Sequence, residues 1–114
     1  MKGENVMKKI ILTEKLRKYL QEKTISYLLA KVSFFSEGCV LIKEPKFEVL
    51  NANDLEEFQA NEKITKDQLT LYISDDFNEI FGSEEEFYLD LKGVLRKKII
   101  IKNIQPIMKR TCKA

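Results

Sequence analysis

The chain has 114 residues, of which 44% are hydrophobic and 33% are charged. This length matches the commonest size of one domain, and the composition excludes a wholly disordered chain. Histidine is absent, so serine–histidine and cysteine–histidine catalytic pairs are excluded. No apolar run approaches the ~20 residues that cross a bilayer, which predicts a protein without a membrane partner.

Residues 1–9 are polar, and we interpret them as a flexible leader in which Met7 is a second candidate start besides Met1. Residues 10–114 contain no repeat, low-complexity tract or Pro/Gly-rich linker, so they predict a single domain. Two cysteines and no visible signal segment favour a reducing compartment, and we expect a cytoplasmic protein.

The first predicted element is a short buried strand, or the lead-in to a helix, at residues 10–12. Thr13 follows as a helix N-cap, because its hydroxyl can accept a hydrogen bond from the first turn. Apolar side chains then recur at three- and four-residue spacing, which predicts an amphipathic helix over about residues 14–23.

Beyond this helix the period changes from 3.6 to 2 residues, which predicts strands. The side chains follow a strand pattern over residues 28–35, a break follows at 36–38, and apolar residues resume at 39–42. Another strand is predicted after Pro45, over residues 46–50.

Residues 51–68 are mostly polar and are predicted to form a loop. The second half of the chain then predicts a strand at 69–73, a short helix at 75–81 capped by Ser74, a strand at 87–92 and a last strand from residue 99. A capping-box pattern at residues 83–86 competes with the strand after it, and the alternation favours the strand. The sequence therefore predicts a mainly β (α+β) fold with about six strands and two short helices.

Charge is distributed unevenly, although the net charge is only +2. Residues 54–90 carry twelve acidic and two basic side chains, a net of −10, whereas residues 91–114 carry eight basic and no acidic ones, a net of +8. Opposite charges this close in a small domain largely neutralise each other. We therefore expect strands from the two segments to pair or pack with opposite charges across from each other, and nucleic-acid binding is disfavoured.

Two groups of carboxylates are candidates for acid–base chemistry, Asp75 with Asp76 and residues 84–86. General acid–base catalysis needs two carboxyl groups in one cleft, whereas these acids lie beside a helix start and a turn. Neither a Ca²⁺-binding loop nor a phosphate-binding glycine loop is present in the sequence. The sequence predicts that the protein is not an enzyme.

The two cysteines are more specific candidates. Cys39 follows Gly38 at the edge of a strand-to-strand turn, and Cys112 lies in a basic tail that we expect to be mobile. Neighbouring cations favour the thiolate, which is the form that binds metals. Two thiolates make only half of a tetrahedral site, so a metal would need a second chain or an outside ligand. A structural role for Cys39, an incidental Cys112 and one long-range disulfide remain open alternatives.

The order of elements from about residue 10 onward resembles the HesB/IscA group, the A-type iron–sulfur carriers. The resemblance is carried by residues 11–14 with the short helix, the strand running into Gly38-Cys39, the strand at 69–73, the segment 89–95, and residues 103–106 ahead of Cys112. The segment 89–95 contains Asp-Leu-x-Gly, which is also similar to HesB-related proteins with a Cys-Cys or Cys-selenocysteine motif. The tail has one cysteine where the group has a Cys-Gly-Cys pair, and Val40 follows Cys39.

This resemblance implies a twisted, barrel-like arrangement of β-strands with a helix at the start. It implies that Cys39 and Cys112, with Gly38 beside Cys39, bind iron or an iron–sulfur cluster. The implied partners are a second copy in a homodimer and iron–sulfur assembly or recipient proteins. The alternative is a degenerate scaffold of the same fold that has lost the cluster and acts as a protein-interaction domain.

Overall fold

The computed structural model describes residues 8–112, so the predicted leader lies outside the described residues except for Lys8 and Lys9. The elements follow in this order: β1 (Lys9–Leu12), α1 (Glu14–Glu22), β2 (Tyr27–Glu37), β3 (Val40–Val49), a 3-10 helix η1 (Ala52–Phe58), β4 (Glu62–Lys66), β5 (Leu69–Ile73), α2 (Asp75–Phe81), β6 (Glu86–Lys92), β7 (Lys98–Ile101) and β8 (Ile107–Arg110). No helix in this described range is long and apolar enough to cross a membrane.

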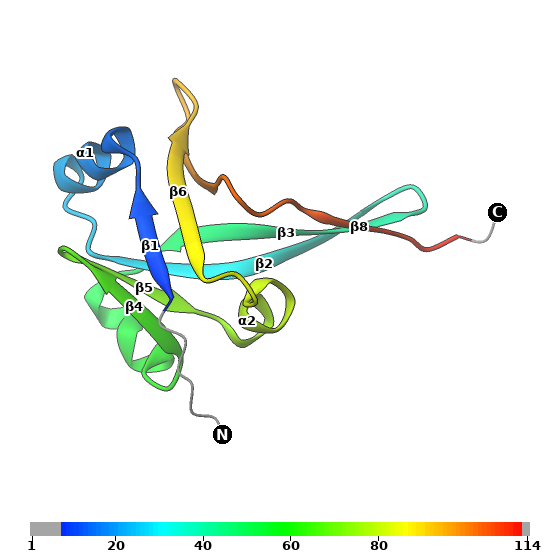
Figure 1. The fold of residues 1–114 in the computed structure, drawn as a ribbon, viewed down its shortest axis with the longest axis horizontal. Helices are drawn as coiled ribbons and strands as arrows, with labels where there is room; N and C mark the ends of the chain where they lie inside the picture. Colours follow the sequence, from blue (N-terminus) through cyan, green and yellow to red (C-terminus); the bar gives the residue numbers. More distant parts are fainter. Residues whose placement is uncertain (1–7, 113–114) are drawn as a thin grey trace.

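The eight strands of the described chain form two sheets (Figure 1). The smaller sheet has the order β1-β6-β7, and the larger sheet, with the order β4-β5-β2-β3-β8, includes the long β2–β3 hairpin. One of the two sheets curls into a half-barrel. The pairs β1–β6 and β2–β5 are parallel, whereas the other pairs are antiparallel. The predicted mainly β (α+β) fold is confirmed, with eight strands in place of about six.

Both predicted helices are confirmed, and each begins where a side chain caps it. The Thr13 hydroxyl accepts a hydrogen bond from Leu16 N–H at 3.2 Å, and the Ser74 hydroxyl accepts one from Phe77 N–H at 3.2 Å. These hydroxyls satisfy backbone donors that have no partner within the helix, so both helix starts are determined locally. The two aspartates in the first turn of α2 lie at the positive end of the helix dipole, and their negative charges stabilise the helix there.

The main hydrophobic core takes side chains from both sheets and is centred on three phenylalanines. Phe77 of α2 is fully buried, and its ring centroid lies 5.4 Å from that of Phe81 and 5.7 Å from that of Phe87. The other buried members come mainly from α1, β1, β2, β5, β6 and β7. Burial of each large apolar side chain contributes roughly 1.5–3 kcal/mol, so this core dominates the stability of the domain.

Residues 51–68 are not the loop that the sequence predicted, because they contain η1 and β4. Leu55 and Phe58 of η1 pack on a second, smaller cluster on the opposite face of β2 from the main core; its buried members are Leu29, Leu50 and Tyr72. β4 pairs with β5 across a two-residue turn. Leu55 and Phe58 are enough to hold η1 against the sheet, although the segment is mostly polar, because the smaller cluster supplies their packing partners.

The strands predicted at 39–42 and 46–50 are one continuous strand, β3, which passes through Pro45. β3 pairs with β2 along its whole length, and Val32 lies opposite Pro45. β8 pairs only with residues 40–43, so β3 forms the edge of the sheet at Pro45. An edge position tolerates the missing N–H of proline, which explains why the strand is not interrupted.

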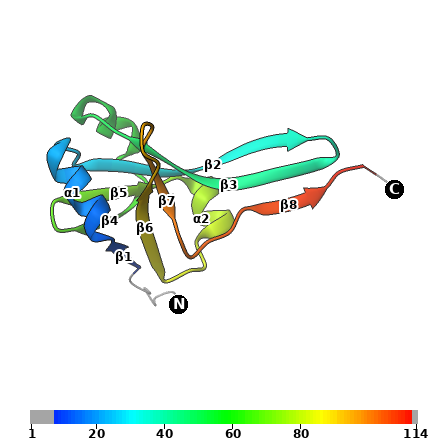
Figure 2. The ribbon, with the colours of Figure 1, turned by 90° about the horizontal axis from the view of Figure 1, so that it is seen from above.

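The β2–β3 hairpin extends beyond the body of the domain (Figure 1). β2 has 11 residues, and its buried side chains end at Val32. Beyond that point the hairpin projects from the body, and β8 lies along it (Figure 1, Figure 2). We term this projection the arm and define it as residues 33–44 together with residues 107–112.

The acidic and basic segments meet in the smaller sheet, as predicted, but the register does not place opposite charges across from each other, because Asp90 lies opposite Ile100 and Lys92 lies opposite Lys98. β6, at the end of the acidic segment, pairs with β7 of the basic segment. Lys102 Nζ lies 4.0 Å from Asp90 Oδ2, which gives one ion pair between the segments. The other basic strand, β8, pairs with β3 instead, and within the described residues neither Lys109 nor Arg110 forms an ion pair.

Asp90 joins β6 to the start of α1. Its carboxylate accepts hydrogen bonds from the Thr13 hydroxyl and from the Leu91 N–H, both at 2.8 Å. The hydrogen bond from Thr13, followed by that from Leu91, lowers the pKa of Asp90 below its ordinary value, and the charge of Lys102 acts in the same direction. Thr13 therefore caps α1 and holds β6 with the same hydroxyl.

Asp90→Asn should lower the free energy of unfolding at neutral pH by an amount that shrinks in acid. Because the folded pKa of Asp90 lies below its unfolded value of about 3.9, its stabilising contribution is present above that value and is lost as the pH falls through the folded pKa. Urea unfolding at neutral pH and at about pH 3 should show the gap between wild type and variant narrowing. An equal gap at both pH values would contradict this role.

Candidate functional site

The arm ends in a turn that contains two of the predicted site residues. Gly38 and Cys39 alone join β2 to β3, and both are exposed. Gly38 has a φ of +61°, a left-handed conformation that glycine adopts without steric cost. Cys39 thus lies at the edge of the sheet, outside the core, where the sequence predicted it.

Cys112 lies beside Cys39, and the two form a disulfide with a Cα–Cα distance of 5.0 Å across 73 residues of sequence. β8 brings them together, because Val40 pairs with Arg110 and Thr111 N–H donates to the Cys39 carbonyl at 2.7 Å. The expectation of a mobile tail is wrong, since the tail contains a paired strand. The interpretation that favoured free thiols is also wrong, and the long-range disulfide is the alternative that the structure contains.

The structure brings Cys39 and Cys112 together at the end of the arm. Over residues 8–112, no group of three or more His, Cys, Asp or Glu side chains is placed to hold a metal ion. One chain therefore supplies two of the four ligands that a tetrahedral iron or iron–sulfur site needs. Metal binding by these cysteines stays a prediction. A cytoplasmic location also stays a prediction. The Cys39–Cys112 disulfide does not support it, because disulfides are typical of oxidising compartments.

Cys39→Ser should lower the free energy of unfolding by up to about 4 kcal/mol, because a crosslink across 73 residues restricts the unfolded chain. The serine strands no buried polar group, since position 39 is exposed. Urea unfolding without reductant measures the loss, and Cys112→Ser should reproduce it. Losses below about 1 kcal/mol in both variants would show that the crosslink does not stabilise the fold.

The arm exposes large apolar side chains on both faces. Four of the eight large hydrophobic side chains exposed in the described residues lie here: Phe34 (50% exposed), Phe35 (42%), Ile107 (41%) and Met108 (67%). Because paired residues share a face, Phe35, Ile42 and Met108 form one row across the three strands. Ile42 is buried within this row, and Phe35 and Met108 are exposed on either side of it. Exposed apolar side chains grouped in this way indicate an interaction site.

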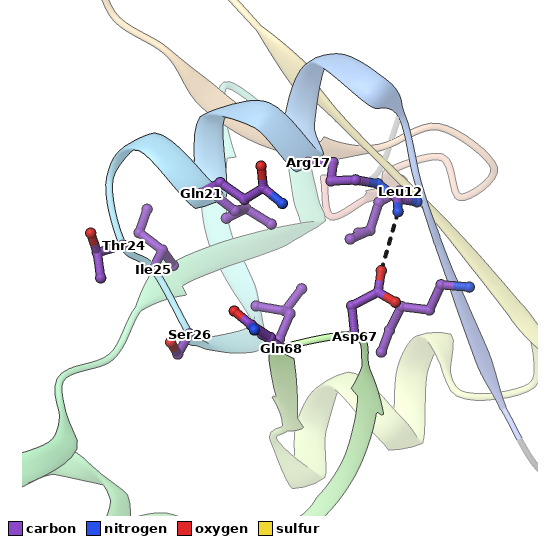
Figure 3. A pocket seen from close by; sticks show the side chains of 11 residues that line it. Leu12, Arg17, Gln21, Thr24, Ile25, Ser26, Asp67 and Gln68 are labelled. Atoms are coloured by element: carbon purple, nitrogen blue, oxygen red, sulfur yellow. Dashed lines mark hydrogen bonds and ion pairs between the residues drawn. The ribbon is translucent and has the colours of Figure 1, made fainter.

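A groove lies away from the arm, between α1 and the β4–β5 turn (Figure 3). Its volume is about 470 Å³, and its lining combines aliphatic side chains with polar ones such as Gln21 and Gln68. Arg17 Nη1 lies 3.3 Å from Asp67 Oδ2 and links the two walls. Arg17 Nε is buried and has no hydrogen-bond partner within the described chain. The groove was not predicted, because residues 66–68 of this wall lie in the segment that was interpreted as a loop.

Two non-glycine residues that line this groove, Thr24 and Asp67, have a left-handed φ of 56°. Thr24 directly follows the C-cap of α1, and the next N–H, that of Ile25, donates to the Leu20 carbonyl at 2.9 Å. This bond defines a Schellman motif, whose left-handed position usually holds glycine. A β-branched side chain is strained there, so α1 ends in a strained residue at the groove.

Thr24→Gly should raise the free energy of unfolding by about 1 kcal/mol, because glycine adopts the left-handed conformation without strain. Thr24→Ala keeps a Cβ atom and should give little of this gain. Urea unfolding of the three proteins checks the prediction. A decrease in stability on Thr24→Gly would mean that contacts of the threonine side chain outweigh its strain.

Comparison with known proteins finds no matching family model, no matching curated protein and no matching solved structure. The resemblance to the HesB/IscA group therefore stays a prediction from the sequence. What can be said of function depends on the arm, the disulfide and the surface of this chain.

Proposed function

We propose that this chain is a protein-interaction domain that binds an extended segment of a partner protein along strand β8. One observation carries the proposal: the arm combines an open strand edge with exposed apolar side chains. The interaction domain is the second of the two functions that the sequence left open.

The backbone of β8 supplies the first part of the binding surface. β8 is the edge strand of the larger sheet, so the backbone groups on its outer side have no strand partner in the part of the chain that is described. An open edge accepts a further strand through main-chain hydrogen bonds. A bound segment would add a sixth strand to the five of this sheet.

The side chains of β8 supply selectivity, because they alternate between the two faces of the arm. Met108 extends the apolar row of Phe35 and Ile42 on one face, and Ile107 is exposed on the other. Lys109 and Arg110 follow with no ion pair inside the described chain. A partner segment with two adjacent apolar residues beside Ile107 and Met108 and two adjacent acidic residues beside Lys109 and Arg110 complements this pattern on both faces.

The disulfide supports this surface by holding the outer end of β8 against the hairpin turn. β8 has four residues, too few for an isolated strand pair to be stable in water. The Cys39–Cys112 bond closes the distal end of the pairing and fixes its register. The oxidised protein therefore presents the edge in one arrangement.

A short extended peptide with two adjacent valines beside two adjacent glutamates should bind the oxidised protein, whereas the same peptide with lysines in place of the glutamates should not. The acidic peptide pairs its charges with Lys109 and Arg110, and the basic peptide repels them. Chemical-shift changes in an NMR titration should be confined to β8 and the row that includes Phe35.

Met108→Asp should abolish this binding, because it removes the most exposed apolar side chain of the row. Leu95→Asp makes an equally drastic change at an exposed site outside the arm and should leave binding intact. Equal binding of both peptides, or binding that survives Met108→Asp, would contradict the proposal. A wild-type dimer that Met108→Asp dissociates would show that a second copy is the partner instead.

A second candidate function, iron or iron–sulfur binding, is favoured by the proximity of the two cysteines. Their Cα atoms lie 5.0 Å apart at an exposed site, so reduction would leave two thiols side by side. Two such chains would together supply the four thiolates of a cluster. This function requires the reduced form, whereas strand addition requires the oxidised form.

Reduced protein supplied with Fe²⁺ and sulfide should develop thiolate-to-iron charge-transfer absorption that elutes with a dimer. Cys39→Ser should abolish the absorption, because it removes one of the two ligands that each chain contributes. Cys112→Ser should weaken or abolish it as well. A reduced wild-type protein without the absorption would exclude this function and leave the interaction domain.

A further inference from the structure

The turn between β6 and β7 exposes two aliphatic side chains almost completely. Val94 is 86% exposed and Leu95 is 96% exposed, more than any other large hydrophobic residue described. Both lie in the five residues between Lys92 and Lys98, where the pairing of the two strands ends. They do not belong to the arm, and neither contributes to the hydrophobic clusters of the described chain.

The turn has a defined conformation. Gly93 has a φ of +104°, and a Cβ atom at this position would collide with the carbonyl oxygen of Arg96. Only glycine allows the chain to turn this tightly at the end of β6. Lys97 Nζ lies 5.8 Å from the ring centroid of Tyr19, which ties the base of the turn to α1. The two aliphatic side chains are therefore held at the apex of a hairpin.

Cations surround this apex. Lys92, Arg96, Lys97 and Lys98 are all exposed, and none of them forms an ion pair within residues 8–112. No acidic residue follows Asp90 in the sequence, and within the described residues the ion pair of Asp90 is with Lys102 rather than with these four cations. We term Val94 and Leu95 the aliphatic tip of the turn, and we term the four surrounding cations, Lys92, Arg96, Lys97 and Lys98, the basic collar.

We infer that this turn attaches the protein to the surface of a membrane that contains anionic phospholipid. The aliphatic tip enters the boundary between headgroups and acyl chains, and the collar contacts the headgroups. A protein partner would need a matching pocket to bury the two side chains of this convex tip. A lipid surface needs no such pocket, because it deforms around the tip. Nucleic acid would complement the collar but leave both aliphatic side chains in water.

This attachment does not depend on the proposed function of the arm. The turn and the arm project from different sides of the body, so both surfaces can be occupied together (Figure 1). The sequence predicted no membrane partner because it contains no spanning segment. Attachment to a membrane surface requires none.

The chain contains no tryptophan, so Leu95→Trp creates a single fluorescent reporter at the apex. Its emission should shift to the blue with phosphatidylcholine vesicles that contain phosphatidylserine, and should not shift with phosphatidylcholine alone. Raising the salt concentration should weaken the binding, because the collar acts through charge. In the same background, replacing Lys92, Arg96 and Lys98 by glutamine should lower the vesicle affinity about a hundredfold.

Met108→Trp places the matched control reporter on the arm, where it is also exposed, and its emission should not respond to vesicles. Val94→Ser in the Leu95→Trp background should weaken the binding, because it removes half of the native aliphatic tip. An unshifted Leu95→Trp emission with anionic vesicles would overturn the inference, as would an equal response from Met108→Trp. A salt-sensitive response to a single-stranded oligonucleotide without any response to vesicles would identify nucleic acid as the ligand instead.

Discussion

The structure depends on a mismatch in length between one hairpin and the body that supports it. β2 and β3 have 11 and 10 residues, whereas every other strand has four to seven. The inner part of β2, from Leu28 to Val32, is covered on one face by the main core and on the other by η1. The outer part has no such cover, so it must be stabilised by something other than burial.

A third strand and one covalent bond provide that stabilisation. β8 pairs with the outer half of β3, and the Cys39–Cys112 disulfide closes the free end. The same arrangement leaves the outer edge of β8 open and keeps Phe35 and Met108 exposed. Stability and binding are thus coupled: the device that holds the arm together also presents its surface, and it is sensitive to reduction.

The sequence predicted those elements whose cause is local, and it failed where partners are distant. Thr13 and Ser74 mark both helix starts because a capping hydroxyl acts within one turn. η1 escaped prediction because Leu55 and Phe58 pack on a cluster whose members, such as Tyr72, are distant in the sequence. β4 escaped it because its pairing with β5 defines it. Strand β8 escaped it for the same reason, since the four-residue strand is defined by its pairing with β3. The disulfide between Cys39 and Cys112 was one of several open alternatives, because it depends on a register that the sequence does not encode locally.

Hydrogen exchange of the oxidised and the reduced protein tests most directly whether the disulfide holds the arm. The amides of β8 and of Thr111, whose N–H donates to the Cys39 carbonyl, should be protected in the oxidised protein. Reduction should make these amides exchange rapidly, while the amides of α2 and β6 in the core keep their protection. Protection of β8 that is unchanged by reduction would contradict the account, because β8 would then be held on the arm without the disulfide.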